Sequence, residues 1–418
     1  MASSSTVSID LKYLATRLFS QLTQQNRGVN IFFSSASIAL ALSICAVGAR
    51  NETLQQLLEV FRGRKSTTAS ESFAIEQLTK TTEDILRVFN NADQDRQIQL
   101  KLVNRLYAQK TYPLQKDYLN LVRKSFQTDV QLEDFVNEKV KLVQAINTWV
   151  EKQTNHLIRN ILSFDDLTDS TQLIIINCIY FKGLWVYPFQ NFSTNQRADF
   201  HELNGTISKV KLMYQRGKFP YAENKDLNIQ IAHLPYKSET NQNFVFTIIL
   251  PNRGVQFEKF EEKLTSNPQL MKQILSNQTT SSTELALYLP KFKIETTFRL
   301  NNALIQLGIE NAFSYQSADF TGMVKREDMQ DNLYINRVIH KTFIEVDELG
   351  EEIFQQISSI ILSLGTEAAA ATLIDCVESC IISKPPVEFK VDRPFIFVIQ
   401  EIHRGIILFQ GKFISANK

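Results

Sequence analysis

The chain has 418 residues, enough to bury a large core, and its 44% hydrophobic and 21% charged residues are ordinary for a globular protein. Its formal net charge is +1, which gives no electrostatic reason to expect nucleic acid or a membrane surface as a partner. The 10 prolines and 13 glycines are scattered, so no linker divides the chain and we expect a single domain over residues 1–418.

The first predicted element is an amphipathic helix close to the N-terminus. Its leucines recur three or four positions apart, at Leu11, Leu14, Leu18 and Leu22. This spacing is the period of one helix face. Asp10, Lys12 and Arg17 interrupt the apolar run and no basic region precedes it, so the segment does not resemble a secretory signal. We therefore expect a cytoplasmic location, with an extracellular one by unconventional secretion left open.

The next segments alternate between strand and helix. Residues 30–33 are predicted to form a short strand. Residues 35–49 are nearly all apolar, which predicts a helix buried on all sides. Asn51 can cap the helix that follows, and residues 62–97 are polar around one helical pattern, which indicates a surface region.

The middle of the chain contains the clearest strand. Residues 101–109 alternate as a strand does, Pro113 precedes a helix that ends at Phe126, and residues 145–158 have a helical period. Residues 171–181, TQLIIINCIYF, are apolar and β-branched without alternation. That pattern predicts a central strand covered on both faces.

The remaining elements are mainly strands. We expect them near residues 229–234, 244–250, 284–294, 336–347, 394–400 and 406–413, with a helix at 298–308. No apolar run exceeds about half the length that spans a bilayer. The order of elements does not repeat as strand–helix–strand units, so the sequence favours an α+β fold with large, mainly antiparallel sheets.

The sequence shows no catalytic or metal-binding pattern. The five histidines are His156, His201, His233, His340 and His403. None of them has the spacing of a metal ligand pair, and no nucleophile elbow is present. The pair Asp165–Asp166 is interpreted as loop and cap residues. We therefore predict that the protein is not an enzyme, with no catalytic residue, no cofactor and no metal.

The four cysteines do not match a zinc site. Cys45 and Cys178 lie in apolar runs, where a free thiol acts as a small hydrophobic group. Cys376 and Cys380 flank Val-Glu-Ser without a second ligand pair. Reduced thiols in a cytosolic compartment fit this usage best.

One segment near the C-terminus is unusual in its small side chains. It is GTEAAAAT: Gly365, Thr366, Glu367, Ala368, Ala369, Ala370, Ala371 and Thr372. Alanine is the best helix former, yet no apolar period runs through the segment. Pro385–Pro386 ends any regular element that follows it.

Several blocks of sequence, in order, resemble the serpin family. They are NIFFSSASIALALSICAVGA, INTWVEKQT, IIINCIYFKGLW, LPKFKIE, LGI with a following Phe, and DRPFIFVI. The segment GTEAAAAT resembles the family's hinge, which precedes the reactive-centre loop. The resemblance extends from about residue 10 to the C-terminus and is nearest to the intracellular, ovalbumin-like branch. It implies a serpin-like single domain with about nine helices and an exposed reactive-centre loop at about 366–386.

The resemblance implies a suicide-substrate inhibitor of a serine protease. The protease cuts the exposed loop, and the loop then inserts as a new strand of the main sheet. Because side chains alternate along a strand, one set must enter the closing sheet and be small and uncharged. That set is Thr366, Ala368, Ala370 and Thr372, while Glu367, Ala369, Ala371 and Leu373 face the other way. A flexible alanine loop without insertion is the plainer alternative.

The family's spacing from the hinge glycine implies where the loop is cut. Fourteen positions after Gly365 is Ser379, followed by Cys380. A small neutral Ser379 favours a target protease with an elastase-like or subtilisin-like pocket. A shift of one position would place Glu378 or Cys380 at the cut instead.

Six further residues carry over from the family one by one. Ser34, Ser37, Asn177 and His340 match the shutter, a polar cluster beneath the sheet where it opens. A lone buried histidine is usually a hydrogen-bonded core residue. For His340 this interpretation and the shutter interpretation agree, because the shutter role is itself hydrogen bonding. Trp185 and Glu348 match the breach, where the loop first enters.

The sequence departs from the family in two places. Ser35 stands where a proline is usual, with a modest expected effect. Residues 351–365, EEIFQQISSIILSLG, separate VDELG from TEAAAAT, which the family usually joins directly. The segment is either an insertion or a retained intron of about 45 nucleotides. An insertion would lengthen the tether before the hinge and weaken inhibition.

The expected partner is therefore a serine protease, bound by a monomer without nucleic acid or membrane. The alternatives are a non-inhibitory serpin with a binding, storage or chaperone role, and an inhibitor of a cysteine protease. The small hinge favours the inhibitor and the segment 351–365 favours the non-inhibitory serpin.

Overall fold

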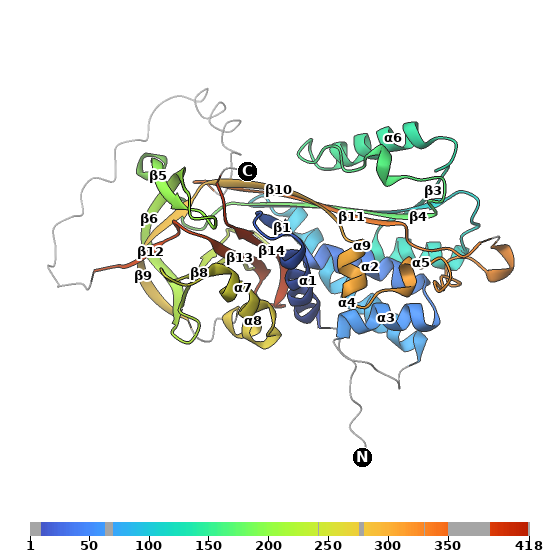
Figure 1. Ribbon diagram of the computed structural model, residues 1–418, viewed down its shortest axis with the longest axis horizontal. Coiled ribbons are helices and arrows are strands. Elements are labelled where there is room, and N and C mark those ends of the chain that lie inside the picture. Colours follow the sequence, from blue (N-terminus) through green and yellow to red (C-terminus); the bar gives the residue numbers. More distant parts are fainter. Residues whose placement is uncertain are drawn as a thin grey trace, which may run out of the picture.

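The computed structural model describes residues 10–62, 70–240, 242–275, 280–329, 331–349 and 385–416. In these ranges the chain forms nine α-helices and two β-sheets (Figure 1). Nine of the twelve strand pairings are antiparallel, so the predicted α+β class with large, mainly antiparallel sheets is confirmed. The expected hinge at 365–372, the bond between Ser379 and Cys380, and the segment 351–365 lie outside the described residues.

The helices lie mainly in the first half of the chain. They are α1 (Leu11–Gln25), α2 (Ser35–Gly48), α3 (Asn51–Arg62), α4 (Glu71–Gln94), α5 (Lys116–Phe126), α6 (Lys139–Gln153), α7 (Phe257–Thr265), α8 (Pro268–Ile274) and α9 (Asn301–Gln306). None of the helices in these ranges has the length and apolar character needed to cross a bilayer.

The smaller sheet has five strands in the order β10-β11-β4-β2-β3. Their bounds are β2 (Ile98–Gln109), β3 (Val130–Glu133), β4 (Leu173–Gly183), β10 (Phe292–Arg299) and β11 (Arg337–Val346). The central strand β4 is buried along its whole length except at Lys182. The prediction of a central strand covered on both faces is therefore confirmed.

The larger sheet follows the order β1-β14-β13-β8-β7-β6-β9-β12, and β5 pairs with β6. Its strands are β1 (Ile31–Phe33), β5 (Asn195–His201), β6 (Ile207–Asn224), β7 (Ile229–Pro235), β8 (Phe244–Pro251), β9 (Ser281–Pro290), β12 (Val387–Lys390), β13 (Phe395–Glu401) and β14 (Ile406–Phe413). Strands β1 and β14 pair although they come from opposite ends of the chain.

Two separate hydrophobic clusters hold these layers together. The main one contains α2, whose fourteen residues are all buried as predicted, together with the inner sides of both sheets. The other lies between α6 and the outer face of the five-stranded sheet, where Val143 and Ile146 pack near Ile176 and Ile339. The contacts that hold α6 on the sheet are therefore separate from the main core.

The N-terminal helix forms as its leucine spacing predicts. Leu14, Leu18 and Leu22 are buried in α1. Asp10 caps this helix, since its carboxylate accepts from the backbone N–H groups of Lys12 and Tyr13.

Two strand predictions needed correction. Residues 284–294 were expected to form one strand, but β9 ends at Pro290 and β10 begins at Phe292. The two strands belong to different sheets, so the chain changes sheet at Lys291. Strand β6 was not predicted, because its half-exposed pattern is less apolar than that of a central strand, and its partner along most of its length, β9, is distant in sequence.

A buried ion pair joins α7 to the larger sheet. Lys412 of β14 is 1% exposed, and its Nζ lies 2.9 Å from Oε1 and 3.2 Å from Oε2 of Glu261. Burial raises the pKa of Glu261, and the Lys412 ammonium opposes that shift. Removing one partner of such a pair leaves the other charge buried and uncompensated.

We expect Glu261→Ala to lower the free energy of unfolding by about 3 kcal/mol, because Lys412 loses its counter-ion. The double variant Glu261→Leu, Lys412→Met should be much closer to wild type, since no buried charge remains. Urea unfolding of the three proteins measures both effects. Equal losses in the single and double variants would contradict this account.

Candidate functional site

The two central strands of the five-stranded sheet form a parallel pair, here called the seam. β11 pairs with β4 from Arg337 opposite Ile174 to Phe343 opposite Tyr180. β11 is antiparallel to β10 on its other side, and β4 is antiparallel to β2. β11 is also the last strand before residue 350. The chain therefore leaves the sheet beside the seam.

The pairing across the seam does not extend to the ends of its strands. The register stops at Phe343 and Tyr180, although β11 continues to Val346 and β4 to Gly183. Beyond this point each strand pairs with its outer neighbour, β10 or β2. At the end close to Trp185, the last three residues of each strand are thus not paired across the seam, and we call this the unzipped end.

The inner face of the seam contains the four polar residues that the sequence predicted to lie together. Asn177 of β4 and His340 of β11 are opposite each other in the register, and His340 Nδ1 hydrogen-bonds Asn177 Oδ1. The Ser37 hydroxyl donates to the same oxygen over 2.7 Å, and the Asn177 amide donates to the Ser37 carbonyl over 3.2 Å. The Ser34 N–H donates to His340 Nε2 over 3.0 Å. All four residues are fully buried.

The N-terminus of α2 positions the two serines. Ser34 is the N-cap, and its Oγ accepts from the Ser37 N–H over 3.1 Å while donating to the Leu408 carbonyl of β14 over 2.7 Å. One hydroxyl thus fixes the start of a buried helix against the larger sheet. The same turn presents Ser37 and the Ser34 N–H to the seam.

The hydrogen bonds of His340 define its protonation. Nε2 accepts from a backbone N–H, so the proton is on Nδ1 and the ring is neutral. A second proton on Nε2 would face a donor. Burial lowers the pKa of His340 to about 3, in agreement with this geometry.

Trp185 closes the unzipped end of the seam. It is 2% exposed, its ring stacks on Tyr236 with centroids 4.4 Å apart, and its Nε1 donates to the Asp347 carbonyl over 3.0 Å. Its backbone N–H donates to the Leu349 carbonyl over 3.2 Å. Trp185 therefore holds the chain just after β11, at the last described residues before position 350.

Glu348 lies in the same place and is paired. Its carboxylate accepts from the Thr194 hydroxyl over 3.1 Å and from Lys291 Nζ over 3.0 Å. Burial raises its pKa, but hydrogen bonds and the Lys291 ammonium hold the pKa below its usual value. Beside it, burial raises the pKa of Asp347 to about 6. Glu348, which matches the breach in the sequence, therefore forms a mostly buried ion pair beside Trp185.

The outer face of the seam is covered by the turn after α6, residues 154–160, here called the strap. Asn155, His156 and Asn160 have positive φ angles of 50°, 63° and 50°, which fold the chain back over the sheet. The Thr154 hydroxyl donates to the Val150 carbonyl over 2.8 Å and accepts from the Ile158 N–H over 3.2 Å. These bonds connect the strap to the end of α6.

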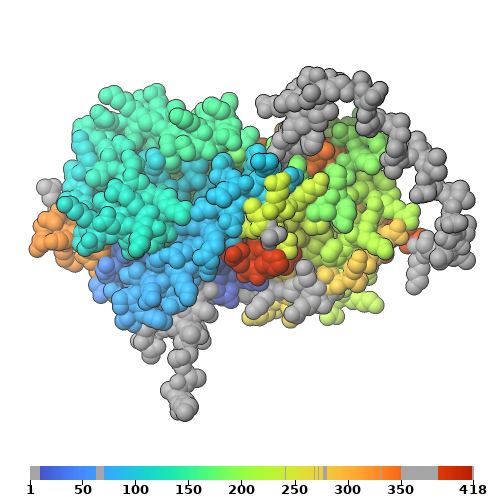
Figure 2. Space-filling view, turned by 180° about the vertical axis from the view of Figure 1, so that it is seen from behind, coloured from blue at the N-terminus to red at the C-terminus, as the bar shows by residue number. Residues whose placement is uncertain are grey.

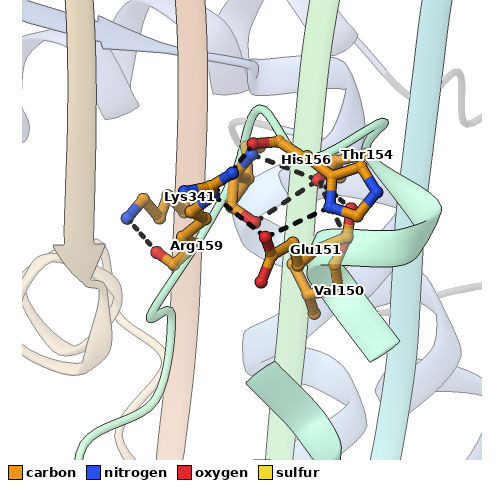
Figure 3. A network of polar contacts seen from close by, with 7 residues as sticks. Val150, Glu151, Thr154, His156, Arg159 and Lys341 are labelled. Atoms are coloured by element: carbon orange, nitrogen blue, oxygen red, sulfur yellow. Dashed lines mark hydrogen bonds and ion pairs between the residues drawn. The ribbon is translucent and has the colours of Figure 1, made fainter. Parts of the chain in front are cut away.

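The strap is hydrogen-bonded to both strands of the seam, and Figure 3 shows its bond to Lys341 of β11. Asn155 Nδ2 donates to the Tyr180 hydroxyl of β4 over 2.9 Å, and Lys341 Nζ of β11 donates to the Arg159 carbonyl over 2.6 Å. Lys341 also pairs with Glu295 of β10, 2.7 Å away. The strap therefore bridges the outer side of the seam, as Asn177 and His340 do on the inner side.

A third set of contacts fastens the strap to α6. Glu151 Oε1 lies 3.1 Å from His156 Nδ1 and 2.9 Å from Arg159 Nε (Figure 3). His156 and Arg159 are largely exposed, so these pairs contribute little on their own. Sequence reasoning missed the strap. Its best signal is Lys341, a lysine in the middle of the mostly buried strand β11.

The other predicted residues have structural roles. Cys45 and Cys178 are free and buried, and burial raises the pKa of both thiols. Asp166 is a cap, as predicted, accepting from Ser163, and it also binds Arg299 through two hydrogen bonds of 2.6 and 2.9 Å. Cys376 and Cys380 lie outside the described residues. Within the described ranges, no group of three or more His, Cys, Asp or Glu residues is arranged to hold a metal ion.

Comparison with known proteins extends over nearly the whole chain. The family described as Serpin (serine protease inhibitor) matches residues 10–416. Serpin B4 of Homo sapiens is 32% identical over 95% of this chain and 96% of that protein. Leukocyte elastase inhibitor of Homo sapiens is 32% identical over 96% of this chain and 97% of that protein. The crystal structure of uncleaved ovalbumin is 26% identical and matches with a TM-score of 0.79, covering 98% of this chain and 100% of that one.

Because His340 is buried and neutral, we predict that the free energy of unfolding depends on pH through this residue. Its pKa is about 3 in the folded chain and about 6.5 in the unfolded chain. Between these values only the unfolded state binds the proton, so the free energy of unfolding decreases as the pH falls below 6.5. His340→Gln should therefore cost about 2 kcal/mol at pH 7.5 and almost nothing at pH 5, because wild type alone loses about 2 kcal/mol over that range.

Urea unfolding at the two pH values measures this difference. Burial also lowers the pKa of His233, to about 4. His233 and Asp347 titrate in both wild type and His340→Gln, so their contributions to the pH dependence cancel. Ser37→Ala is the matched control, since it damages the same cluster without removing a titratable group. A cost of His340→Gln that stays constant with pH would show that the histidine is not held neutral.

Proposed function

The chain belongs to the serpin family, and we propose that it inhibits a serine-type endopeptidase as a suicide substrate. The protease is captured by the segment after β11, and that segment then inserts into the seam. The observation that supports this most is the direction of the strands. The seam is parallel, and the chain that carries the expected loop leaves directly from β11.

Insertion at the seam improves the pairing of the sheet. A segment that reverses after β11 runs antiparallel to β11 and, because the seam is parallel, antiparallel to β4 as well. One parallel ladder is replaced by two antiparallel ladders, which are slightly more stable per residue. Each new backbone hydrogen bond contributes about 0.5–1.5 kcal/mol net. A strand of a dozen residues bonded on both sides therefore supplies on the order of 10 kcal/mol.

The chemistry of capture belongs to the protease. Its serine Oγ attacks the carbonyl carbon of Ser379, the peptide bond to Cys380 breaks, and the amine of Cys380 takes the proton and leaves. The product is an ester between Ser379 and the protease. If the hinge inserts before water attacks this ester, the protease is carried along and its active site is distorted. The small side chain of Ser379 fits an elastase-like or subtilisin-like pocket.

The hinge side chains suit entry into the closed sheet. The inward-facing set is Thr366, Ala368, Ala370 and Thr372. None of them carries a charge or a bulky group to bury. The unzipped end of the seam, next to Trp185 and Glu348, is where we propose that entry begins.

The polar clusters on the two faces of the seam would then control the opening. Asn177 and His340 must separate before a strand can pass between them, which supports the shutter role proposed for them with Ser34 and Ser37. The strap must release at least one of its two bonds, to Tyr180 or to Lys341. The cost of opening sets the rate of insertion, and the new ladders supply the driving force.

A non-inhibitory serpin is the second candidate, and the segment 351–365 is the feature that favours it. Fifteen additional residues between β11 and the hinge would delay insertion, so that water could release the protease first. For either function we propose a monomer located in the cytoplasm.

The first test is to mix the chain with elastase, subtilisin and chymotrypsin separately and run denaturing gels. We expect a band at the summed mass that survives boiling, and a released peptide that begins at Cys380. Ala370→Arg should abolish the band while cleavage continues, because a charged group cannot enter the sheet. Ala371→Arg, on the opposite face of the same strand, is the matched control. Cleavage by all three proteases without any stable band would favour the second candidate.

The strap gives a second, independent test of insertion. Lys341→Met keeps the apolar stem of the side chain but removes its bond to the Arg159 carbonyl. A synthetic peptide copying residues 366–379 should then enter the sheet roughly tenfold faster, because about 1.5 kcal/mol of the opening cost is lost. Lys293→Met is the control, since Lys293 pairs with Glu345 and not with the strap. The rate of peptide insertion is measured from the change in thermal stability that the bound peptide causes. Equal rates for wild type, Lys341→Met and Lys293→Met would show that the strap has no part in the mechanism.

A further inference from the structure

A polar hollow lies at the end of the molecule opposite to α6. Its volume is about 410 Å³, and it lies between β5, β6, β9 and β12. Arg197 of β5, Arg253 after β8 and Lys390 of β12 line it. In both views the strands β5 and β6 are at one end of the molecule, while α5 and α6 are at the other (Figures 1 and 2).

The hollow has an excess of positive charge. Asp392, whose side chain is 3% exposed, is already compensated by Arg393 Nη1 at 3.0 Å, by Arg253, and by Lys390 Nζ at 3.8 Å. Asp199 is paired with Lys209. The residues that line the hollow and their charged neighbours comprise five cations and three carboxylates: Arg197, Lys209, Arg253, Lys390 and Arg393 against Asp199, Glu388 and Asp392. A chain with a net charge of only +1 thus gathers an excess of two positive charges here.

The cations are positioned for a ligand and not only for Asp392. The side chain of Arg253 is 61% exposed and that of Lys390 is 38% exposed. Lys390 Nζ lies 5.9 Å from the centre of the Tyr288 ring, which packs against Tyr214 at a tilt of 38°, so the aromatic pair helps to hold the ammonium at the rim. No hydrogen bond or ion pair joins the Arg197 guanidinium to any residue that the structure describes. Arg197 is therefore available to an anion.

We propose that this hollow docks acidic side chains on the surface of the protease that the loop captures, an inference that rests on the proposed function. Lys390 belongs to β12, which begins at Val387, seven positions after Cys380. Seven residues span at most about 25 Å. A globular protease of about 230 residues has a radius of gyration of about 17 Å, so one held at Ser379 reaches the hollow.

The shape of the hollow favours protein carboxylates over a polyanionic chain. The affinity of proteins for a polyanion grows with the number of phosphate or sulfate groups neutralised along an extended track. Here the cations converge on one space with room for a few side chains. Exposed charges at the rim of an interface mainly raise the association rate, and salt weakens that effect.

The test compares Arg197→Glu and the milder Lys390→Gln with Lys116→Glu, an exposed charge reversal on α5 at the far end. The rate at which the intact chain is consumed is measured with two serine proteases, one acidic and one basic around its active-site cleft, from 50 to 500 mM NaCl. Consumption counts both cleavage and trapping, so it reports docking even if no stable complex forms and the inhibitory function fails. Thermal unfolding confirms that each variant is folded.

We expect Arg197→Glu to slow consumption by the acidic protease about tenfold at low salt, Lys390→Gln about threefold, and Lys116→Glu not at all. The difference should disappear at 500 mM NaCl and be absent with the basic protease. Equal effects of Arg197→Glu and Lys116→Glu would overturn the proposal. A second result would also overturn it: the wild type binds heparin, Arg197→Glu does not, and both proteins are consumed at the same rate by each protease. The hollow would then be a polyanion site.

Discussion

The parallel pairing of β4 with β11 is the constraint on which the arrangement of this molecule depends. Each of these strands has an antiparallel neighbour on its outer side, so the seam between them is the place where the central part of the sheet is least well paired. The chain leaves the sheet from one side of this seam. A strand added there relieves the mismatch and finds an antiparallel partner on both sides.

The side chains around the seam make its closed state specific. On the inner face, Asn177 and His340 hold each other across it, and each is also bonded to the start of α2. On the outer face, the strap spans it from Tyr180 to Lys341. Buried polar groups of this kind are costly when left unpaired, so under the proposed mechanism these contacts would break together. Because the small core beneath α6 is separate from the main core, the outer cover could lift in the proposed mechanism while the main core stays packed.

Much of the fold was predictable from local patterns, and much of the site was not. The period of α1, the nearly all apolar α2 and the unbroken run of β4 were recognised because burial alone decides their composition. The pairing of β6 with β9 and the change of sheet at Lys291 depend on segments distant in sequence, which no local window contains. The inner cluster was found only through the family resemblance, since Ser34, Ser37, Asn177 and His340 have no spacing of their own. Asn155 and Arg159 in the strap act through a turn with three left-handed residues, which single-residue patterns do not reveal.

Cys178 can serve as a chemical probe of opening at the seam. Its thiol is fully buried on β4, opposite Lys341 in the register of the seam, and burial raises its pKa so that it stays protonated and unreactive while the strands are paired. Cys178 lies in the cluster under α6, so an alkylating reagent can reach it only in those molecules, and at those moments, in which α6 has lifted from the sheet or the strands have parted. The rate of its modification therefore counts spontaneous openings of the native sheet, much as amide exchange counts local unfolding.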